Sequence, residues 1–407
     1  MWGLYYGAIY MYVLLVRLSA IKSPKARLWL KGRENQFEKI KLALPQNPKR
    51  IWMHCASLGE FEQGRPILEK LRTDYPEYAL IVSFFSPSGY EIRKNYKGAD
   101  SVIYLPEDLP GNAKKFLDEL NPSLAIFVKY EFWAGYLNEL KKREIPAILI
   151  SARFRKKQFL FSPFGGWVRN KLKAFDTIHV QDVLSNELLA NAGFQNLKIS
   201  GDTRYDRVYA NAQTPEAIYQ ITDWLKDRRV LVAGSTWADD EAVILPWNFN
   251  NLALIIAPHE IDEAHIKSIE DRCGAKSLRY TKLKNHQQED SDVLILDTIG
   301  ILMSVYKAGN IAYVGGAFHK LLHNILEPAA MGLPVIFGPF TEKFPEAEAL
   351  MNAGGGFKIH SRLEFEQALR VVEQNDSSGR QSLEFVCSQT GATTIIMEDI
   401  RKLLKEK

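Results

Sequence analysis

Two carboxylates stand where a predicted strand gives way to a helix. Glu60 lies in "SLGEFEQG" (57–64), directly after the apolar run "IWMHCA", and Glu131 lies in "KYEFW" (129–133), directly after "LAIFV". In an open parallel sheet, the residues that follow the carboxyl ends of the strands line the ligand site. A carboxylate placed there can act as a general base, or it can simply stabilise the helix dipole. The position of Glu60 alone favours the second role, so both stay open.

One cation and several small residues follow other predicted strands. Arg204 lies in "ISGDTRYDRV" (199–208), and an arginine can neutralise a phosphate or a carboxylate through two parallel hydrogen bonds. A surface ion pair is an equally good explanation of Arg204. In the second half, "AGSTWADDE" places Ser235 and Thr236 at a helix start. Their backbone N–H groups either bind a phosphate or belong to an ordinary helix cap.

The stretch "GGAFHKLLHNILEPAAMGLPVIFGP" (315–339) combines several of these features. Gly315 and Gly316 follow an apolar strand and permit a close backbone approach. Asn324 can cap a helix in which Glu327 accepts hydrogen bonds from ribose hydroxyls. The order of strand, glycine turn, helix start and buried strand is what a sugar-nucleotide pocket requires.

Other chemistries lack their motifs. "HEIDEAH" is not a zinc-protease helix, because His259 and His265 are six residues apart, and the glycine-rich flanks of His319 and His323 favour a loop. The sequence contains no GxxxxGK[ST] and no GxSxG, and no GxGxxG follows its first strand. These observations argue against an NTPase, a dinucleotide oxidoreductase and an ordinary hydrolase, and we expect neither a metal nor a cofactor. A net charge of +4 is too small to indicate nucleic-acid binding.

The rest of the sequence alternates short apolar runs with helical patterns, which predicts two doubly wound α/β halves, each built on a parallel sheet. The expected strands are 51–56, 79–85, 101–105, 124–128, 146–151 and 177–181 in the first half, and 229–235, 252–258, 293–297, 311–316 and 333–338 in the second. A length of 407 residues is sufficient for two or three domains. The three cysteines, an odd number without close pairing, indicate buried thiols in a reducing compartment.

The N-terminus is unusually apolar. Residues 2–16 carry no charge, and six basic residues follow between Arg17 and Arg33. A full span needs about 20 apolar residues, and a secretory signal carries its charges before the apolar run. We expect an uncleaved membrane anchor held on the cytoplasmic side by the basic cluster; a buried first helix is the alternative. "RFRKKQFLFSPFGGW" (153–167), basic and then aromatic, suits a bilayer surface or a solvated loop.

Taken together, the ordered segments resemble the 3-deoxy-D-manno-octulosonic acid (Kdo) transferases, enzymes of the GT-B fold. The resemblance covers nearly the whole chain. It is carried by "HCASLGE", "SFFSPSGYE", "KYEFW", "SARF", "GDTRYD", "GSTWADDE", "IIAPHE" and "YVGGAFHKLLHNILEPAAMGLPVIFGP". Each segment is weak by itself, whereas the set in this order is specific.

The resemblance implies an inverting transfer of Kdo from CMP-Kdo to a lipid A precursor, without a metal, at the cytoplasmic face of the inner membrane. It assigns Glu60 as the proton acceptor, and Glu131 and Arg204 as groups that stabilise the transition state. The segments that would contact CMP are Pro258 and His259; Gly300, Ile301 and Leu302; and Asn324, Ile325, Leu326 and Glu327. Ser235, Thr236, Gly315 and Gly316 are further candidates for backbone contacts to the phosphate.

The alternation of strands and helices, interrupted by a polar stretch near residue 209, sets the expected domains. They are an anchor with its basic segment (1–33), an acceptor-side Rossmann-like domain (34–208), a linker (209–228), a CMP-sugar-binding Rossmann-like domain (229–385) and a terminal helix (386–407), with the two large domains facing a cleft.

The sequence departs from the family pattern at four positions. Lys129 replaces a glutamate, His259 an arginine, Ile301 a glutamate and Arg204 a lysine. Another membrane-associated GT-B transferase that uses a UDP- or GDP-sugar, and an inactive nucleotide-sugar-binding protein, remain as alternatives.

Overall fold

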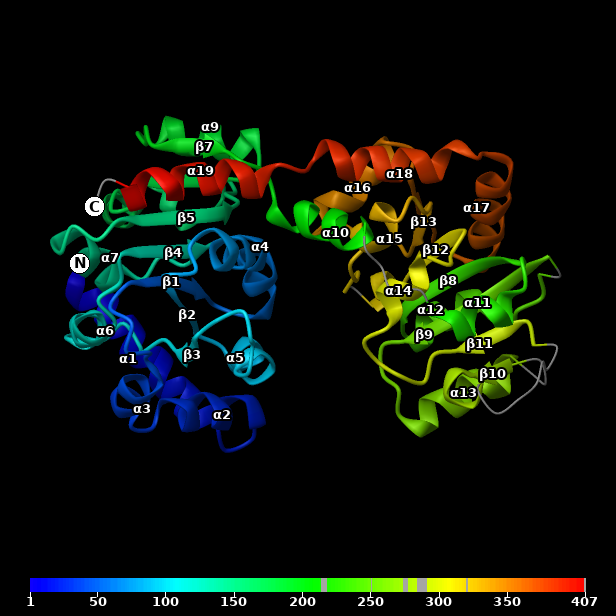
Figure 1. The fold of residues 1–407 in the computed structure, drawn as a ribbon, viewed down its shortest axis with the longest axis horizontal. Helices are drawn as coiled ribbons and strands as arrows, with labels where there is room; N and C mark the ends of the chain where they lie inside the picture. The colour runs from blue at the N-terminus through cyan, green and yellow to red at the C-terminus, as the bar shows by residue number, and fades with distance from the viewer. Residues whose placement is uncertain (214–217, 250, 274–276, 284–290, 320, 406–407) are drawn as a thin grey trace. The chain divides into compact units, whose positions relative to one another are not determined.

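The computed structural model describes residues 1–213, 218–249, 251–273, 277–283, 291–319 and 321–405. The chain divides into two units: the first comprises Met1–Asp206 with Thr390–Lys407, and the second comprises Arg207–Gln389. The chain therefore passes between the units twice, once within the helix α10 and once before the last helix, α19 (Figure 1).

The first unit is a seven-stranded parallel sheet with the strand order β3-β2-β1-β4-β5-β6-β7. Its strands are β1 (Arg50–Cys55), β2 (Ala79–Phe84), β3 (Ser101–Tyr104), β4 (Leu124–Val128), β5 (Ala147–Ala152), β6 (Thr177–Val180) and β7 (Leu197–Ile199). Its helices are α1 (Trp2–Ser19), α2 (Pro24–Arg33), α3 (Gln36–Ala43), α4 (Leu58–Asp74), α5 (Pro87–Arg93), α6 (Asn112–Leu120), α7 (Ala134–Lys142), η1 (Phe159–Phe161), η2 (Pro163–Gly165), α8 (Gly166–Leu172), α9 (Val183–Asn191), the start of α10 (Thr203–Gln213) and α19 (Ala392–Lys405).

The second unit is another seven-stranded parallel sheet, with the order β10-β11-β9-β8-β12-β13-β14. Its strands are β8 (Arg229–Thr236), β9 (Leu252–Pro258), β10 (Ser277–Arg279), β11 (Val293–Ile295), β12 (Ile311–Val314), β13 (Val335–Phe337) and β14 (Gly356–Lys358). Its helices are α11 (Tyr219–Leu225), α12 (Ala238–Ile244), α13 (Glu263–Cys273), η3 (Tyr280–Lys282), α14 (Leu302–Tyr306), η4 (Ala317–His319), α15 (Leu326–Ala330), α16 (Pro345–Asn352), α17 (Arg362–Gln374) and α18 (Ser377–Ser388). The prediction of two parallel α/β sheets is confirmed.

The period of two along a strand distributes the core of the first unit over both faces of its sheet. In β1, Trp52 packs into one buried cluster, while Ile51 and Met53 pack into the other. Helices α6 and α7 cover the Trp52 face, and α4 and α19 cover the opposite face. Because both faces are covered, the strands are continuous apolar runs, as a parallel sheet requires.

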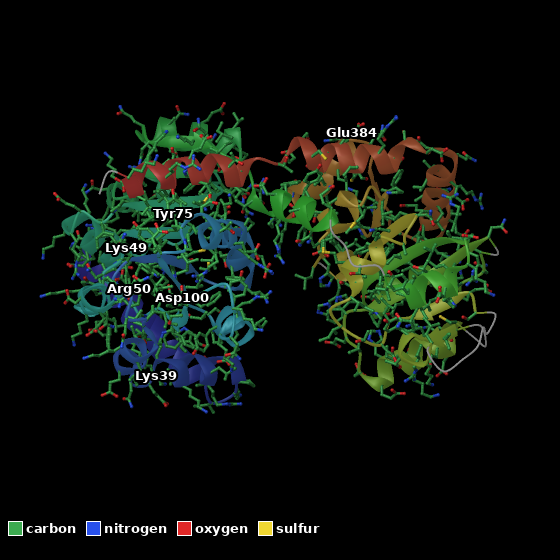
Figure 2. All side chains as sticks on the ribbon, in the orientation of Figure 1. Lys39, Lys49, Arg50, Tyr75, Asp100 and Glu384 are labelled. Atoms are coloured by element: carbon green, nitrogen blue, oxygen red, sulfur yellow. The ribbon has the colours of Figure 1, made fainter. Side chains whose placement is uncertain are left out.

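Charged side chains at the amino ends of the strands serve the fold. Arg50, at the start of β1, donates to the carbonyl oxygens of Pro45, Glu119 and Leu120. Asp100, just before β3, accepts hydrogen bonds from the backbone N–H of Leu80 and from Arg72, which lies 2.5 Å away (both Arg50 and Asp100 are labelled in Figure 2). We therefore look for polar side chains that could bind a ligand at the carboxyl ends of the strands.

The first helix, α1, is only partly buried. Its Tyr5 hydroxyl donates to Asp108 Oδ2 at 2.6 Å, and Trp2 packs edge-on against Trp167 at 5.3 Å. On its other side, Leu15 and Leu18 are more than half exposed. Among the helices that the structure describes, none has both the length and the apolar character needed to cross a bilayer.

Two further segments bear on the expected domains. The expected linker, 209–228, contains the end of α10 and all of α11. The expected terminal helix, 386–407, contains the end of α18 and then α19.

Candidate active site

In the first unit, Glu131 is held by a chain of hydrogen bonds that begins inside the sheet. His54, on β1, is fully buried; its Nε2 lies 3.0 Å from Glu131 Oε2, and its Nδ1 lies 2.9 Å from Ser83 Oγ. Trp52 Nε1 donates to Ser83 Oγ at 2.8 Å. Because the Glu131 carboxylate can only accept, its contact with Nε2 requires a proton on that nitrogen. In the neutral ring, Nδ1 then accepts from the Ser83 hydroxyl.

A second donor fixes the same carboxylate oxygen. Trp133 Nε1 donates to Glu131 Oε2 at 2.6 Å, and the Glu131 side chain is only 12% exposed. Lys129, just before this turn, has a φ of 71°, a conformation that non-glycine residues rarely adopt. Strained backbone of this kind is frequent where a side chain must be aimed at a site.

Glu60 lies in the first turn of α4 and is partly buried, and the hydroxyl of Ser57 donates to its Oε2. The thiol of Cys55, at the end of β1, is influenced by the charges of both Glu60 and Glu131. Burial raises the pKa of Cys55 well above its usual range, and the Glu60 and Glu131 carboxylates raise that pKa further. The structure therefore gathers both predicted carboxylates around the end of β1.

Tyr130 belongs to the same rim. Burial raises the pKa of its hydroxyl, and the negative charges of Asp182 and Glu60 add to this shift, whereas Arg155 and Arg153 oppose it. The carboxyl edge of the first sheet thus combines acidic groups with two arginines.

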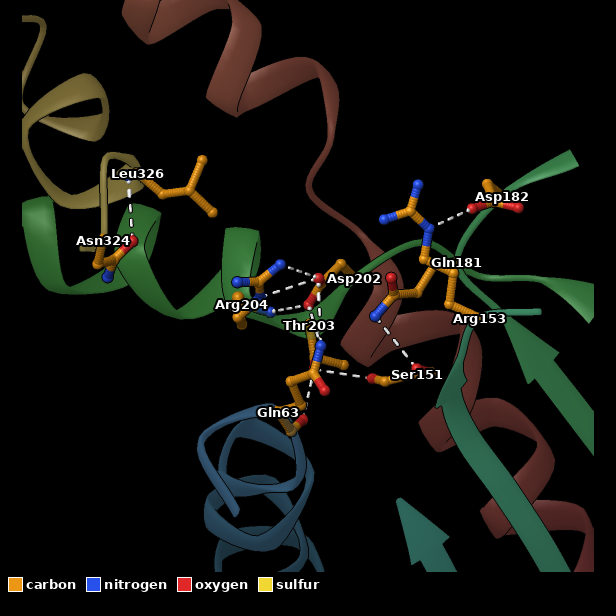
Figure 3. A network of polar contacts seen from close by, with 10 residues as sticks. All are labelled: Gln63, Ser151, Arg153, Gln181, Asp182, Asp202, Thr203, Arg204, Asn324 and Leu326. Atoms are coloured by element: carbon orange, nitrogen blue, oxygen red, sulfur yellow. Dashed lines mark hydrogen bonds and ion pairs between the residues drawn. The ribbon is translucent and has the colours of Figure 1, made fainter. Parts of the chain in front are cut away.

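Arg204, the third predicted residue, is anchored by an aspartate (Figure 3). Its Nε donates to Asp202 Oδ2 at 2.9 Å, and its Nη2 lies 2.8 Å from the same oxygen. Asp202 is buried and also lies near Gln63 Nε2, at 3.3 Å. The Arg204 side chain is 36% exposed, so part of it can meet a ligand while Asp202 fixes its direction.

The surrounding network joins three chain segments (Figure 3). Thr203 Oγ1 donates to the carbonyl oxygen of Gln63 on α4 and lies 3.2 Å from Ser151 Oγ on β5. Ser151 has a φ of 52° beside a bulge between β5 and β6. Asp206 plays another part: it accepts hydrogen bonds from the N–H groups of Gly391 and Thr393 and so caps α19.

In the second unit, the predicted glycine turn lies tightly against β8. A Cβ atom on Gly315 would come within 2.3 Å of the Ser235 carbonyl oxygen, and Gly316 has a φ of 93°. Asp240 accepts hydrogen bonds from Gly316 N at 2.8 Å and Trp237 N at 2.9 Å. The Gly315 N–H donates to Gly234 O. These two glycine N–H groups, predicted as phosphate contacts, thus have partners inside the protein.

Thr236 is engaged as well. Its hydroxyl donates to Glu241 Oε1 at 3.1 Å, and Glu241, although fully buried, is also bound by His265 at 2.9 Å and by Arg272 at 2.6 Å. The backbone carbonyl of Thr236 accepts from the N–H of His259. A buried ion-pair network therefore sets the position of the last residue of β8 and of His259 beside it.

A group of stacked rings covers this edge. Trp237 stacks on His259 with ring centroids 4.7 Å apart and on His319 at 5.6 Å, and His259 stacks on His323 at 4.5 Å. Trp237 Nε1 donates to His323 Nε2 at 3.2 Å. Burial and the neighbouring His259 lower the pKa of His323 to about 4. Of these rings, sequence reasoning had singled out only His259 as a ligand contact.

The other predicted nucleotide contacts converge on α14 and α15. Asn324 Oδ1 accepts from Leu326 N at 3.1 Å, and Asn324 Nδ2 donates to Glu327 Oε1 at 3.0 Å. Burial raises the pKa of Glu327, and Arg207 opposes this shift. The Tyr306 hydroxyl fills the space beside Gly234, where a Cβ would meet it at 2.0 Å.

Gly300 has a φ of 91° and precedes Ile301 and Leu302 at the start of α14. Pro258 ends β9, with His259 directly after it. Ile325, like Leu326, is buried, so its side chain supports the turn.

Comparisons with known proteins match one family to part of the chain and show individual relatives along its whole length. A family described as 3-deoxy-D-manno-octulosonic-acid transferase (kdotransferase) matches residues 31–207, which contain Glu60, Glu131 and Arg204. The 3-deoxy-D-manno-octulosonic acid transferase of Haemophilus influenzae is 27% identical over 100% of this chain and 99% of its own length. The chain is a homologue of the Kdo transferases. The resemblance seen in the sequence motifs is confirmed.

Two further comparisons concern a second relative and the fold. The 3-deoxy-D-manno-octulosonic acid transferase of Aquifex aeolicus is 29% identical, over 81% of this Kdo transferase homologue and 89% of its own length. A putative UDP-N-acetylglucosamine 2-epimerase from Listeria monocytogenes has a TM-score of 0.60 at 14% identity, covering 88% of this chain and 97% of its own. The second likeness concerns the α/β fold alone.

Proposed function

We propose that the protein is an inverting glycosyltransferase that moves Kdo from CMP-Kdo to a lipid A precursor. The observation that carries the proposal is the pair of carboxylates around the end of β1, one held by Ser57 and the other by His54 and Trp133. This pair lies within the region matched by the Kdo transferase family. Glu60 and Glu131 are therefore the residues to which the reaction is assigned.

The proposed chemistry begins at the acceptor. An acceptor hydroxyl is a weak nucleophile at neutral pH, so a carboxylate must take its proton as the oxygen attacks the anomeric carbon. Glu60 is assigned this role because it is only partly buried and lies at a helix start in the rim. Glu131, in contrast, is held by two ring N–H groups and serves to orient and to stabilise developing charge.

The leaving group is CMP, whose phosphate gains charge as the bond to Kdo breaks. We assign Arg204 to this charge because Asp202 fixes its guanidinium while part of it stays exposed. The second unit is assigned the nucleotide, through His259, the turn from Gly300 to Leu302, and Asn324 to Glu327. Here His259 and Ile301 stand where the family pattern has an arginine and a glutamate.

The proposal extends to the membrane. We assign α1 to the cytoplasmic face of the inner membrane, with its exposed leucines in the lipid and the following basic residues at the headgroups. The double variant Leu15→Glu and Leu18→Glu should lose flotation with vesicles of mixed zwitterionic and anionic lipid. Full-length protein that stays at the bottom of the gradient contradicts this part.

One incubation tests the activity itself. Purified full-length protein is mixed with CMP-Kdo and a tetraacylated lipid A precursor, and the masses of the products are measured by mass spectrometry. Addition of one or more Kdo masses is expected, with release of CMP. Parallel reactions with UDP- and GDP-sugars test the alternative donors, and transfer from one of these but not from CMP-Kdo refutes the proposal.

A further inference from the structure

A groove in the first unit lies between α1, α2 and the loop after β2. It has a volume of about 240 Å³, and its walls include Tyr12 and Val16 from α1, Trp29 from α2, and Phe85. The ring centroids of Tyr12, Trp29 and Phe85 lie 5.7–6.0 Å from one another. The three packed rings and Val16 form an apolar wall suited to hydrocarbon rather than to sugar, and Ser23, Lys25 and Ser86 add polar groups to the lining.

One wall of the groove packs against a residue that binds Glu131. Phe85 packs on Trp133 with ring centroids 4.6 Å apart, and Trp133 donates to Glu131 at 2.6 Å. Only two aromatic side chains thus separate the groove from Glu131. A molecule that fills the groove with one part can present another part to the carboxylates.

The outer border of the groove has the character of a lipid surface. Tyr12 and Val16 are one turn apart, and the adjoining ridge of α1 carries Leu15, which is 56% exposed, and Leu18, which is 58% exposed. Lys25, an exposed cation, belongs to the groove lining itself. An apolar channel with a cationic border matches a phosphorylated glycolipid.

A buried polar atom points to the same ligand. Trp29 is 4% exposed, and its indole Nε1 has no hydrogen-bond partner among the residues that the structure describes. An unpaired donor in such a place is costly unless a ligand or a water molecule satisfies it. The ester or amide carbonyl at the base of an acyl chain is the acceptor that a lipid would bring.

We propose that this groove binds an acyl chain of the lipid acceptor, with the Trp29 indole N–H donating to the carbonyl of the acyl linkage. The proposal rests on the proposed function, because it assumes an acylated acceptor whose sugar reaches Glu60 and Glu131. Under this proposal, the first unit alone discriminates between acylated and non-acylated acceptors.

Filling the groove tests the proposal. Val16→Trp places an indole in the groove, and Leu15→Trp, its matched control, places the same group one residue away on the exposed ridge. Kinetics are measured with a tetraacylated lipid A precursor in micelles and with the same disaccharide stripped of its acyl chains. Each methylene removed from the groove is worth about fourfold in affinity.

We therefore expect Val16→Trp to raise the KM for the acylated acceptor at least tenfold. It should leave kcat/KM for the stripped disaccharide within about twofold, and Leu15→Trp should leave both values near those of the wild type. Trp29→Phe keeps a ring but removes the donor, and we expect a several-fold rise in KM for the acylated acceptor alone. Equal effects of Val16→Trp and Leu15→Trp would overturn the proposal.

A measurement without turnover separates this idea from the proposed function. A lipid with a photoreactive diazirine in one acyl chain should label Val16, Trp29 or Phe85 in the wild type, and Val16→Trp should abolish that labelling. If the wild type transfers Kdo to neither acceptor, the proposed function fails, and labelling alone decides the groove. Labelling spread evenly along α1, or loss of vesicle binding by Val16→Trp, would show that the groove serves the bilayer and overturn the acceptor assignment.

Discussion

The two units share one topology but equip the carboxyl edges of their sheets differently. In the first unit, Glu131 is fixed by the ring nitrogens of His54 and Trp133, and Glu60 is fixed by the Ser57 hydroxyl. In the second unit, the edge consists of stacked rings around Trp237 and of glycines in close contact with β8. The first arrangement suits the transfer of a proton, whereas the second suits the binding of a flat, charged ligand. The same fold therefore supports two kinds of chemistry.

The two edges also share one local device. Ser151 on β5 and Ser235 on β8 both have a φ near 50°, and each lies at a bulge near the end of its strand. Such a bulge turns the strand end and re-aims the residues after it. Both units thus accept backbone strain at the edge where a ligand is expected.

The largest expected effect concerns the base. Glu60→Gln should lower turnover by about 10²- to 10⁴-fold, because general-base assistance is typically worth that much. Glutamine keeps the volume and can still accept the Ser57 hydrogen bond, so the melting temperature should change little. Kinetics with CMP-Kdo and a lipid A precursor provide the measurement, and CMP affinity by calorimetry should stay unchanged.

Glu69→Gln is the matched control for Glu60→Gln. Glu69 lies on the same helix, α4, in an exposed pair with Arg65, and its replacement should leave turnover intact. If Glu60→Gln turns over normally, or loses CMP binding instead, Glu60 is a helix-start carboxylate. The assignment of the reaction to the first sheet edge, and of nucleotide binding to the second, would then be wrong.

The next effect concerns the nucleotide. Glu327→Ala should weaken CMP binding by about 1–3 kcal/mol, which is the cost of leaving polar partners without a hydrogen bond. Titration calorimetry of CMP with the variant gives the value. Turnover at saturating donor should suffer much less than in Glu60→Gln. An unchanged dissociation constant would mean that Glu327 only orients Asn324 and α15.

The two units can also be compared through the effect of pH on stability, because each contains a buried aspartate. Burial raises the pKa of Asp108 in the first unit to about 6, although Tyr5 and Gly135 both donate to its Oδ2 at 2.6 Å. Because this pKa is above that of the unfolded chain, the folded state binds more protons, and stability falls as the pH rises from about 4 to 6. Burial also raises the pKa of Asp240 in the second unit, but three donors oppose that shift instead of two.

Asp108→Asn should therefore stabilise the protein at pH 7 by about 1–2 kcal/mol relative to pH 4. The amide oxygen can take both hydrogen bonds at the Oδ2 position, so the contact with Tyr5 survives. Urea unfolding at the two pH values, followed by tryptophan fluorescence, measures the difference. Asp240→Asn should not stabilise the protein, because an amide with one acceptor oxygen replaces a carboxylate that accepts three hydrogen bonds. A gain in stability of Asp240→Asn would contradict the comparison.

The smallest effect concerns the two strained serines. Ser235→Gly should stabilise the protein by about 0.5–1 kcal/mol, because glycine adopts a positive φ without steric cost. Ser151→Gly should be close to neutral, since it also removes the side chain that meets the Thr203 hydroxyl. Thermal unfolding of both variants tests this, and equal shifts would show that the Ser151–Thr203 contact contributes nothing.

Sequence patterns predicted the inner strands of both sheets but not all of their edges. The runs at β1, β2, β4, β8 and β9 are long and apolar because both faces of those strands are covered. The three strands that were missed, β7, β10 and β14, have three residues each and lie at the outer edges of the sheets. So short an edge strand leaves no periodicity to detect.

The candidate site shows the same limit. Glu60, Glu131 and Arg204 were recognisable because each follows a strand or lies at a helix start. The pairing of His54 with Glu131 was not, because the two residues are 77 positions apart and meet only through the parallel order of β1 and β4. The stacking of Trp237 on His259, and of His259 on His323, depends likewise on neighbouring strands that are distant in sequence.

The return of α19 to the first unit has a consequence for the order of folding. Ile396, Met397 and Ile400 complete a core cluster whose other members all come from residues 51–150. During synthesis, the entire second unit leaves the ribosome before these residues do. The part of this face that α19 covers must therefore stay exposed for more than 180 residues of further translation. A nascent chain of this kind is a natural client for chaperones, and a stop codon shortly after Gln389 would leave that part permanently exposed.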